Sequence, residues 1–171
     1  MLDRNTRVLI VDDQHDIHID FQEILNQRNR ETDSDDLAEA FLPVDSTPSP
    51  THYRSTFELS HAFSGDEAYR IIKAAMEANQ PFAVAYIDIR MPPGIDGIET
   101  VRRIRMFDKN LEIVIMTAYT DRPVYEIAMD MEPLHKLLYI RKPIVRVEIQ
   151  QLTLSLVEKW NLEAKLISLT S

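Results

Sequence analysis

The sequence predicts an α/β protein with a parallel sheet of five strands and helices on both faces. Short apolar runs rich in Val and Ile alternate five times with longer segments whose apolar residues recur at helical spacing. Such alternation is typical of parallel strands joined by right-handed helical crossovers. The three glycines, Gly65, Gly94 and Gly97, all fall in predicted connections, which agrees with this arrangement.

Composition excludes several classes of protein. Apolar residues make up 44% of the 171 residues, enough for a hydrophobic core in one domain with additions. The net charge of −9 argues against a nucleic-acid partner, because nucleic acids require a basic surface. The absence of Cys excludes disulfides and thiolate chemistry. A short polar N-terminus, with no apolar run near the ~20 residues of a membrane span, predicts a cytoplasmic chain.

The first strand is predicted at residues 7–11, and two acids, Asp12 and Asp13, follow it directly. Residues 14–27 are predicted to form an amphipathic helix with an apolar stripe of Ile17, Phe21, Ile24 and Leu25. A position near the helix N-cap explains Asp13. A cap needs only one acid, so this role leaves the other acid unexplained. The five histidines show no metal-ligand spacing. We interpret His15 and His18, three residues apart on this helix, as surface residues.

Residues 28–55 differ from the rest, because they are polar, acid-rich and interrupted by three prolines. Residues 36–42 are able to form two helical turns, but a connection this long inside a domain is usually functional or lacks fixed structure. It leads from the first helix to the second strand, at the end of the sheet opposite the strand tips discussed below. We hypothesise that it covers an edge strand or docks a partner. The alternative is a tolerated surface loop.

The remaining elements follow in order. A strand is predicted within residues 56–63, and a capping box from Ser64 to Glu67 opens a helix over 66–79. A mostly apolar strand at 83–88 ends in Asp88, and a Pro-Pro-Gly turn follows it. Asp96 marks the next helix start. Further strands are predicted at 111–116 and 136–140, with a short helix at 123–131 between them. The last helix begins near Val145 and reaches Lys165 or beyond.

Polar residues stand at the tips of four predicted strands: Asp12, Asp13, Asp88, Thr117 and Lys142. In open α/β sheets these tips surround the ligand site. Three carboxylates in one cleft repel each other unless a cation lies among them, and an oxygen-only ligand set favours Mg²⁺. A lysine and a hydroxyl opposite the metal would bind phosphoryl oxygens. The set therefore predicts a site that moves a phosphoryl group onto a carboxylate.

These residues make the chain resemble a response regulator receiver domain of two-component signal transduction. The motifs that carry the resemblance are Val8–Asp13, Asp88–Pro92, Asp96-Gly97, Met116–Tyr119 and Lys142-Pro143. The resemblance covers about residues 6–160, with 28–55 as an insertion. It implies a flavodoxin-like sheet of strand order 2-1-3-4-5. We expect a receiver domain at 1–160, and a helical extension or a linker to a missing output domain at 161–171.

The resemblance also implies roles for single residues. Asp88 resembles the phosphoacceptor, Asp13 the direct ligand of Mg²⁺ or Mn²⁺, and Asp12 a ligand through water. The backbone carbonyl of Arg90 matches the third protein ligand. The remaining site residues that it implies are Thr117 as the switch hydroxyl, Lys142 as the phosphoryl-binding cation, Tyr139 as the aromatic that turns on activation, and Arg90 and Tyr119 as residues that tune phosphoryl lifetime. In one departure from the family pattern, the turn from Met91 to Gly97 is one residue longer.

The expected function is that of a phosphorelay receiver, which catalyses only its own phosphorylation and dephosphorylation. Its expected partners are a histidine kinase or phosphotransfer protein, and an output domain or protein on the face of the fourth helix, fifth strand and fifth helix. One alternative is an aspartyl-nucleophile phosphohydrolase, which usually carries Asp-x-Asp on the first strand. Here that strand ends in Asp12-Asp13. Another alternative is a degenerate receiver that acts only as a binding module.

The C-terminal helix carries two apolar stripes. Val145, Ile149, Leu152 and Leu156 are predicted to pack on the sheet. A second stripe of Val157, Trp160, Ala164 and Ile167 continues past the expected domain end. Apolar spacing of this kind forms two-helix seams. We hypothesise that it pairs with its copy in a homodimer or leads into an output domain, so that the chain is part of a larger protein. The alternative is an end with incidental apolar residues.

Overall fold

The computed structural model describes residues 4–26, 56–118 and 131–170. It contains a five-stranded sheet of order β2-β1-β3-β4-β5 in which all neighbouring strands are parallel. The strands are β1 (Arg7–Val11), β2 (Glu58–Ala62), β3 (Val84–Asp88), β4 (Glu112–Thr117) and β5 (Leu137–Arg141). The α-helices are α1 (His15–Asn26), α3 (Gly65–Glu77), α4 (Gly97–Arg105) and α6 (Arg146–Thr170), with a short 3-10 helix η2 (Leu134–Lys136) before β5. The predicted α/β fold and strand order are confirmed.

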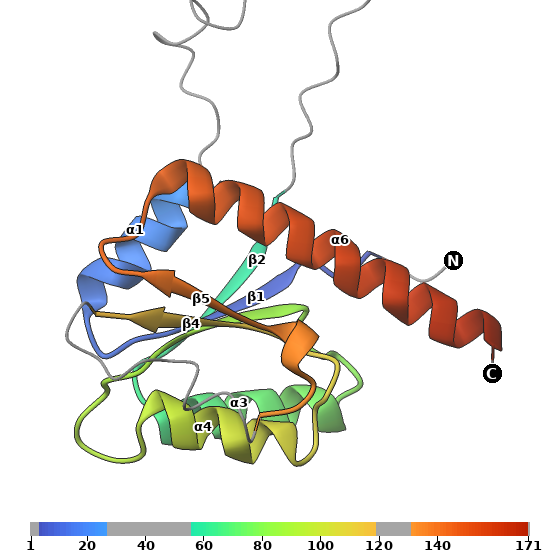
Figure 1. The fold of residues 1–171 in the computed structure, drawn as a ribbon, viewed down its shortest axis with the longest axis horizontal. Coiled ribbons are helices and arrows are strands. Elements are labelled where there is room, and N and C mark those ends of the chain that lie inside the picture. Colours follow the sequence, from blue (N-terminus) through green and yellow to red (C-terminus); the bar gives the residue numbers. More distant parts are fainter. Residues whose placement is uncertain (1–3, 27–55, 119–130, 171) are drawn as a thin grey trace, which may run out of the picture.

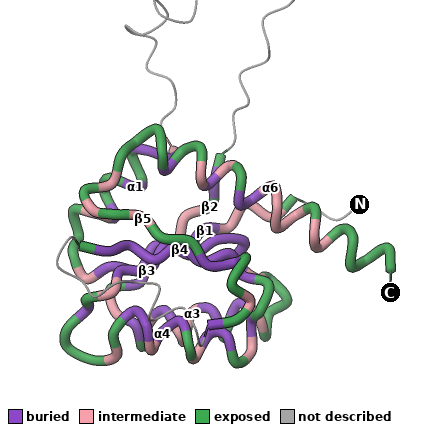
Figure 2. The backbone as a smooth tube through the Cα atoms, viewed as in Figure 1, coloured by how far each residue is buried: buried purple, intermediate pink, exposed green. Residues whose placement is uncertain are grey.

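Helices cover both faces of the sheet, as Figure 1 shows. Helices α1 and α6 lie on one face and α3 and α4 on the other. The central strands are therefore buried from both sides (Figure 2), which explains why their sequences are continuously apolar. Successive residues of a strand point to opposite faces, so β3 contributes Val84 and Tyr86 to the α1–α6 side and Ala85 and Ile87 to the α3–α4 side.

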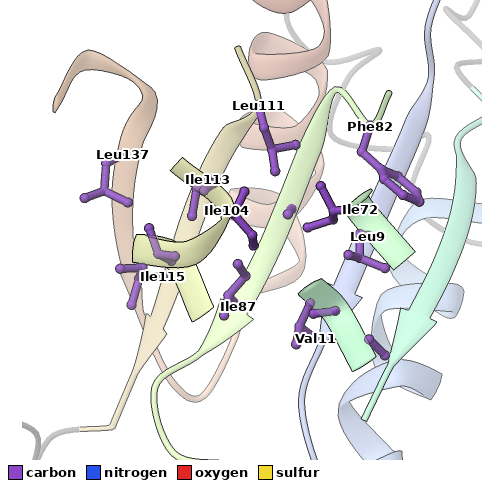
Figure 3. Packing of buried hydrophobic residues seen from close by; sticks show 14 of the residues in the cluster. Leu9, Val11, Ile72, Phe82, Ile87, Ile104, Leu111, Ile113, Ile115 and Leu137 are labelled. Carbon is purple, nitrogen blue, oxygen red and sulfur yellow. The ribbon is translucent and has the colours of Figure 1, made fainter. Parts of the chain in front are cut away.

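Figure 3 shows the core on the α3–α4 side. Ile72 of α3 and Ile104 of α4 lie against alternate strand residues such as Leu9, Ile87 and Ile113. All five side chains are at most 1% exposed. Burying an aliphatic side chain of this size contributes about 1.5–3 kcal/mol, so this layer fixes the helices that carry the connections at the carboxyl edge of the sheet.

The C-terminal helix packs differently from the predicted stripes. Val157 is fully buried, and Trp160 packs against the same core cluster as Leu156. Both had been assigned to a second stripe separate from the sheet, and that assignment is wrong for them. Val145, assigned to the stripe on the sheet, precedes the helix and is 49% exposed. The exposed apolar residues of the helix end are Leu162, Leu166, Ile167 and Leu169.

Two predictions fall on residues outside the described part of the chain. One is the insertion at 28–55. The other is the short helix at 123–131, of which the structure describes only Met131. The flanks of the insertion are α1, which ends at Asn26, and β2, which begins at Glu58. Among the described helices, none is both long enough and apolar enough to cross a membrane.

Candidate functional site

Three carboxylates converge at the carboxyl edge of the sheet, because β1 and β3 are parallel neighbours in register. Val11 pairs with Ile87, and the next residues are Asp12 and Asp88. Oxygen atoms of Asp12, Asp13 and Asp88 all lie within 4.8 Å of one another. We call these three residues the acidic cluster. Asp12 and Asp88 are buried and Asp13 is half-buried, so their mutual repulsion is poorly screened by water.

Lys142 supplies the cation of the site. Its Nζ lies 2.6 Å from Asp12 Oδ2 and 3.1 Å from Asp88 Oδ1. The backbone places it there, since the Lys142 amide donates to the Thr117 carbonyl at 2.8 Å. That bond extends the β4–β5 ladder by one residue beyond the pair Thr117 and Arg141. The structure thus brings together the acids predicted after the first and third strands and the lysine predicted after the fifth.

The two acids that follow β1 differ in their contacts. Asp12 uses both carboxylate oxygens: Oδ1 accepts the Gln14 amide at 2.9 Å, and Oδ2 contacts Lys142. Asp13 is half-buried and follows directly, at the start of the connection to α1. A carboxylate whose oxygens are already engaged is less available as a direct metal ligand than one at the mouth of the site. The geometry therefore favours Asp13 over Asp12 for direct coordination.

Burial and charge shift the pKa values in the site. Burial raises the pKa of Asp88 to about 6, and the nearby charges of Asp12 and Asp13 add to the rise, while Lys142 opposes it. Burial lowers the pKa of Lys142, but its contacts with Asp12 and Asp88 outweigh burial and raise it overall. In the site, the negative charge of Asp88 is therefore costly and the positive charge of Lys142 is favoured. A bound divalent cation would relieve that cost.

The connection from β3 to α4 packs against the backbone of Asp88. Asp96 caps α4 by accepting the Glu99 amide at 2.8 Å, and the Gly97 amide donates to the Ile89 carbonyl at 2.9 Å. A Cβ atom on Gly97 would stand 2.1 Å from the Asp88 carbonyl oxygen. Only glycine allows the helix N-terminus to approach this closely. Gly94 has a φ of 111°, which also favours glycine.

The remaining predicted site residues lie around this edge. Thr117 is buried at the tip of β4, where its Oγ1 donates to the Ile140 carbonyl at 3.4 Å. Tyr139 lies on β5 opposite Ile115 and is 37% exposed. Arg90 is exposed two residues after Asp88, in the turn toward α4. Tyr119 lies outside the described residues.

The acidic cluster fits a divalent metal ion of the magnesium type. Its donors are all oxygen, and three carboxylates against one lysine leave two negative charges for the ion to neutralise. Mg²⁺ prefers one or two carboxylates together with waters and phosphoryl oxygens. Asp13 and Asp88 are the carboxylates best placed to hold it.

Two histidines next to the acidic cluster escaped the sequence prediction. His18 is only 6% exposed, which contradicts its interpretation as a surface residue. Its Nε2 lies 2.8 Å from the Asp12 carbonyl oxygen, and its Nδ1 lies 2.9 Å from Nδ1 of His61 on β2. The helical phase carried a signal for His18, because it shares the buried face with Phe21 and Leu25. No sequence pattern connects it to His61.

The sheet order and the acidic cluster at its carboxyl edge define a flavodoxin-like α/β domain with a candidate metal centre. Residues 52–153, more than half of the chain, match the family model described as the response regulator receiver domain. The chain therefore belongs to the response regulator receiver domain family of two-component signalling. That match begins near the end of the insertion, and the structure places β1, which Asp12 and Asp13 follow, between β2 and β3.

Relatives agree with this family. The chain is 27% identical over 139 residues to sporulation initiation phosphotransferase F of Bacillus subtilis, which covers 81% of this chain and 83% of that protein. A CheY-like response regulator receiver domain protein from Methanospirillum hungatei has a TM-score of 0.61 and 19% identity over 93% of this chain and 98% of that one. The signal receiver domain of an HD domain-containing protein from Pseudomonas fluorescens has a TM-score of 0.66 and 16% identity over 96% of each chain. These structural likenesses show the fold.

Proposed function

We propose that Asp88 accepts a phosphoryl group from a phosphohistidine donor, a histidine kinase or phosphotransfer protein, with Mg²⁺ or Mn²⁺ bound at the acidic cluster. The observation that carries the proposal is the position of Asp88, buried at the tip of β3 within reach of two further carboxylates and the Lys142 ammonium. A side-chain oxygen of Asp88 attacks phosphorus, and the leaving group departs on the opposite side. Lys142 holds a phosphoryl oxygen, and the metal offsets the charge on the others.

Each residue has a stated part in this proposal. Asp13, Asp88 and the Arg90 backbone carbonyl hold the metal, and Asp12 acts through water because both its carboxylate oxygens are engaged. Arg90 and Tyr119 follow Asp88 and Thr117 by two residues in the sequence, and their role in this proposal is to slow the water that hydrolyses the phosphoaspartate. Replacing both with Ala should then shorten the phosphoryl half-life. An unchanged half-life would remove them from this role.

The test of acceptor identity uses a small phosphodonor. Wild-type protein incubated with acetyl phosphate and Mg²⁺ should acquire one acid-stable, base-labile phosphoryl group, and Asp88→Asn should acquire none. Asp20→Asn, which removes an equal charge from the exposed side of α1, is the matched control and should label normally. Full labelling of Asp88→Asn would overturn the assignment. Steady release of phosphate at many turnovers would instead favour the phosphohydrolase.

We propose that the phosphoryl group switches a face of the molecule through Thr117 and Tyr139. Thr117 turns from the Ile140 carbonyl, a long contact of 3.4 Å, to donate to the phosphoryl oxygen. Tyr139, 37% exposed, then turns inward, and the face around β5 and the neighbouring helices changes its preferred partner or output domain. Thr117→Ala should still be phosphorylated but should uncouple Tyr139. Identical Tyr139 resonances with and without beryllofluoride in the wild type would contradict this switch.

A further inference from the structure

The buried His18 and the half-buried His61 form a pair of imidazoles behind the acidic cluster. His18 comes from the first turns of α1 and His61 from β2, the strand beside β1. The His18 Nε2 lies 2.8 Å from the Asp12 carbonyl oxygen, and the two Nδ1 atoms lie 2.9 Å apart. Both distances are those of hydrogen bonds. The pair therefore connects two elements to the backbone of Asp12.

The chemistry of these contacts fixes where the protons lie. A backbone carbonyl only accepts, so His18 Nε2 must carry a proton and donate it. In a neutral imidazole the other nitrogen is then an acceptor, and His61 Nδ1 must donate to it. Burial, followed by the neighbouring His18, lowers the pKa of His61, which agrees with a neutral His61. His18 is thus held as the Nε2–H tautomer and His61 as the Nδ1–H tautomer.

Aromatic side chains pack against the His18 ring. The Phe63 ring lies over it with centroids 4.2 Å apart, and His15 stacks on Phe63 at 4.5 Å. On the strand side, the Asp12 amide donates to the Ala62 carbonyl at 3.1 Å. The amide and the carbonyl of Asp12 are therefore both held, one by β2 and the other by His18.

The held carbonyl belongs to the peptide unit that joins Asp12 to Asp13. Its orientation sets the direction in which the Asp13 backbone and side chain leave β1. We propose that His18, supported by His61, is a positioning residue that keeps the Asp13 carboxylate within metal-binding reach of Asp88. The proposal rests on the metal site described under the proposed function. A side chain that holds a ligand from behind is an outer-shell partner, and losing one typically weakens metal binding about 10–100-fold.

The test compares Mg²⁺ affinities measured by calorimetry at about pH 8, where imidazoles are neutral. His18→Leu should weaken Mg²⁺ binding about tenfold or more. His18→Gln keeps a donor for the Asp12 carbonyl and should restore most of the affinity. His15→Leu is the matched control, because His15 is exposed on the same helix and stacks on the same Phe63, and it should bind as the wild type does. Unfolding curves of the metal-free variants establish that each is folded.

A second readout needs no metal. Nitrogen-15 NMR of the metal-free wild type should show His18 protonated at Nε2 and unprotonated at Nδ1, and the reverse for His61. Should His18→Leu not fold, His61→Leu removes only the supporting donor from a half-buried ring and should weaken Mg²⁺ binding severalfold.

The outcomes separate the two proposals. Wild-type Mg²⁺ affinity in folded His18→Leu would overturn the positioning role alone. If His18→Leu does not fold, wild-type affinity in His61→Leu would do the same. A His18 ring protonated at Nδ1 in the wild type would also overturn that role. A wild-type chain that binds no Mg²⁺ would overturn both proposals.

Discussion

The negative charge of Asp88 is unfavourable in the folded chain despite the nearby Lys142, and a bound metal cation would stabilise it. Its pKa of about 6 in the folded chain exceeds the ordinary value of 3.8, chiefly because the side chain is buried. Protonated Asp88 therefore stabilises the folded state. By linkage, this contribution is complete below pH ~3.8 and is lost as the pH rises through about 6. In the metal-free protein, Asp88 should thus contribute least to the free energy of unfolding at neutral pH and above.

We predict that Asp88→Asn stabilises the metal-free protein. At about pH 7.5, with a chelator present, the free energy of unfolding should rise by about 1–3 kcal/mol. The upper bound of about 3 kcal/mol is the free energy that corresponds to raising the pKa of Asp88 from 3.8 to about 6. The gain should vanish near pH 4, where Asp88 is protonated in the wild type. Urea unfolding at the two pH values measures it. Asp20→Asn serves as the charge-matched control, and an equal gain from that variant would assign the effect to net charge.

The residues of the site divide into those that sequence patterns predicted and those that they did not. Asp12 and Asp88 follow apolar runs directly, and Lys142 follows the last residue of the fifth strand, so locating the strands also located these residues at one edge of the sheet. His18 and His61 were missed because their contact joins a helix and a strand 43 residues apart. Such a pairing depends on the phase of α1 and the register of β2, which no local pattern specifies.

At the scale of single elements, the turn before α4 leaves no room for a side chain at Gly97, the first residue of that helix. The Gly97 position meets the Asp88 carbonyl oxygen, and a Cβ atom there would come within 2.1 Å. We predict that Gly97→Ala moves the start of α4 away from β3, lowers the unfolding free energy by more than 1 kcal/mol and slows labelling of Asp88. Met106→Ala, at the exposed end of the same helix, is the control. Equal stability and labelling in all three proteins would contradict this view of the turn.

We predict that the insertion at 28–55 has no part in the phosphorylation of Asp88. The ends of 28–55 attach to α1 and β2 at the amino edge of the sheet, whereas Asp88 lies at the carboxyl edge. Replacing these residues with a short Gly/Ser link should therefore leave acetyl phosphate labelling of Asp88 intact. A folded variant that fails to label would assign the insertion a part in the site.

Helix α6 shows where pattern reasoning fails for an element. Leu156 and Val157 are adjacent in sequence, and the prediction placed them in different stripes. Both are buried, because a helix that packs on a sheet presents a face at least 100° wide, which includes neighbouring positions. The helix also continues against the body beyond residue 160. Glu163 pairs with Lys136, and Lys136 contacts the buried Glu112 at 2.7 Å.

For the molecule as a whole, we propose that the end of α6 joins the receiver domain to a second copy of the chain or to an output domain. Leu162, Leu166 and Leu169 are spaced by four and three residues and are 63–75% exposed. This spacing is that of a two-helix seam. We therefore transfer the homodimer hypothesis from the predicted stripe to these three leucines, and we propose that the receiver extends to Glu163.

We predict that phosphorylation or beryllofluoride increases self-association through this seam. Sedimentation velocity should show a larger dimer fraction with the mimic, and replacing the three leucines with Ser should abolish it. The variant keeps Asn161 and Glu163, which bond to Asn5 and Lys136, so the helix stays attached. A wild-type chain that stays monomeric in both states would end the homodimer hypothesis and leave a free-standing receiver or a linker to an output domain.

We propose that the phosphoryl group resides on Asp88 and on neither of its acidic neighbours, Asp12 and Asp13. Borohydride reduces an acyl phosphate to a primary alcohol and leaves free carboxylates unchanged, so it marks the modified residue chemically. The chain is treated with acetyl phosphate and Mg²⁺, reduced, digested and mapped by mass spectrometry. Our account predicts homoserine at position 88 and intact aspartates at 12 and 13. Homoserine at 12 or 13, or at any position other than 88, would contradict it.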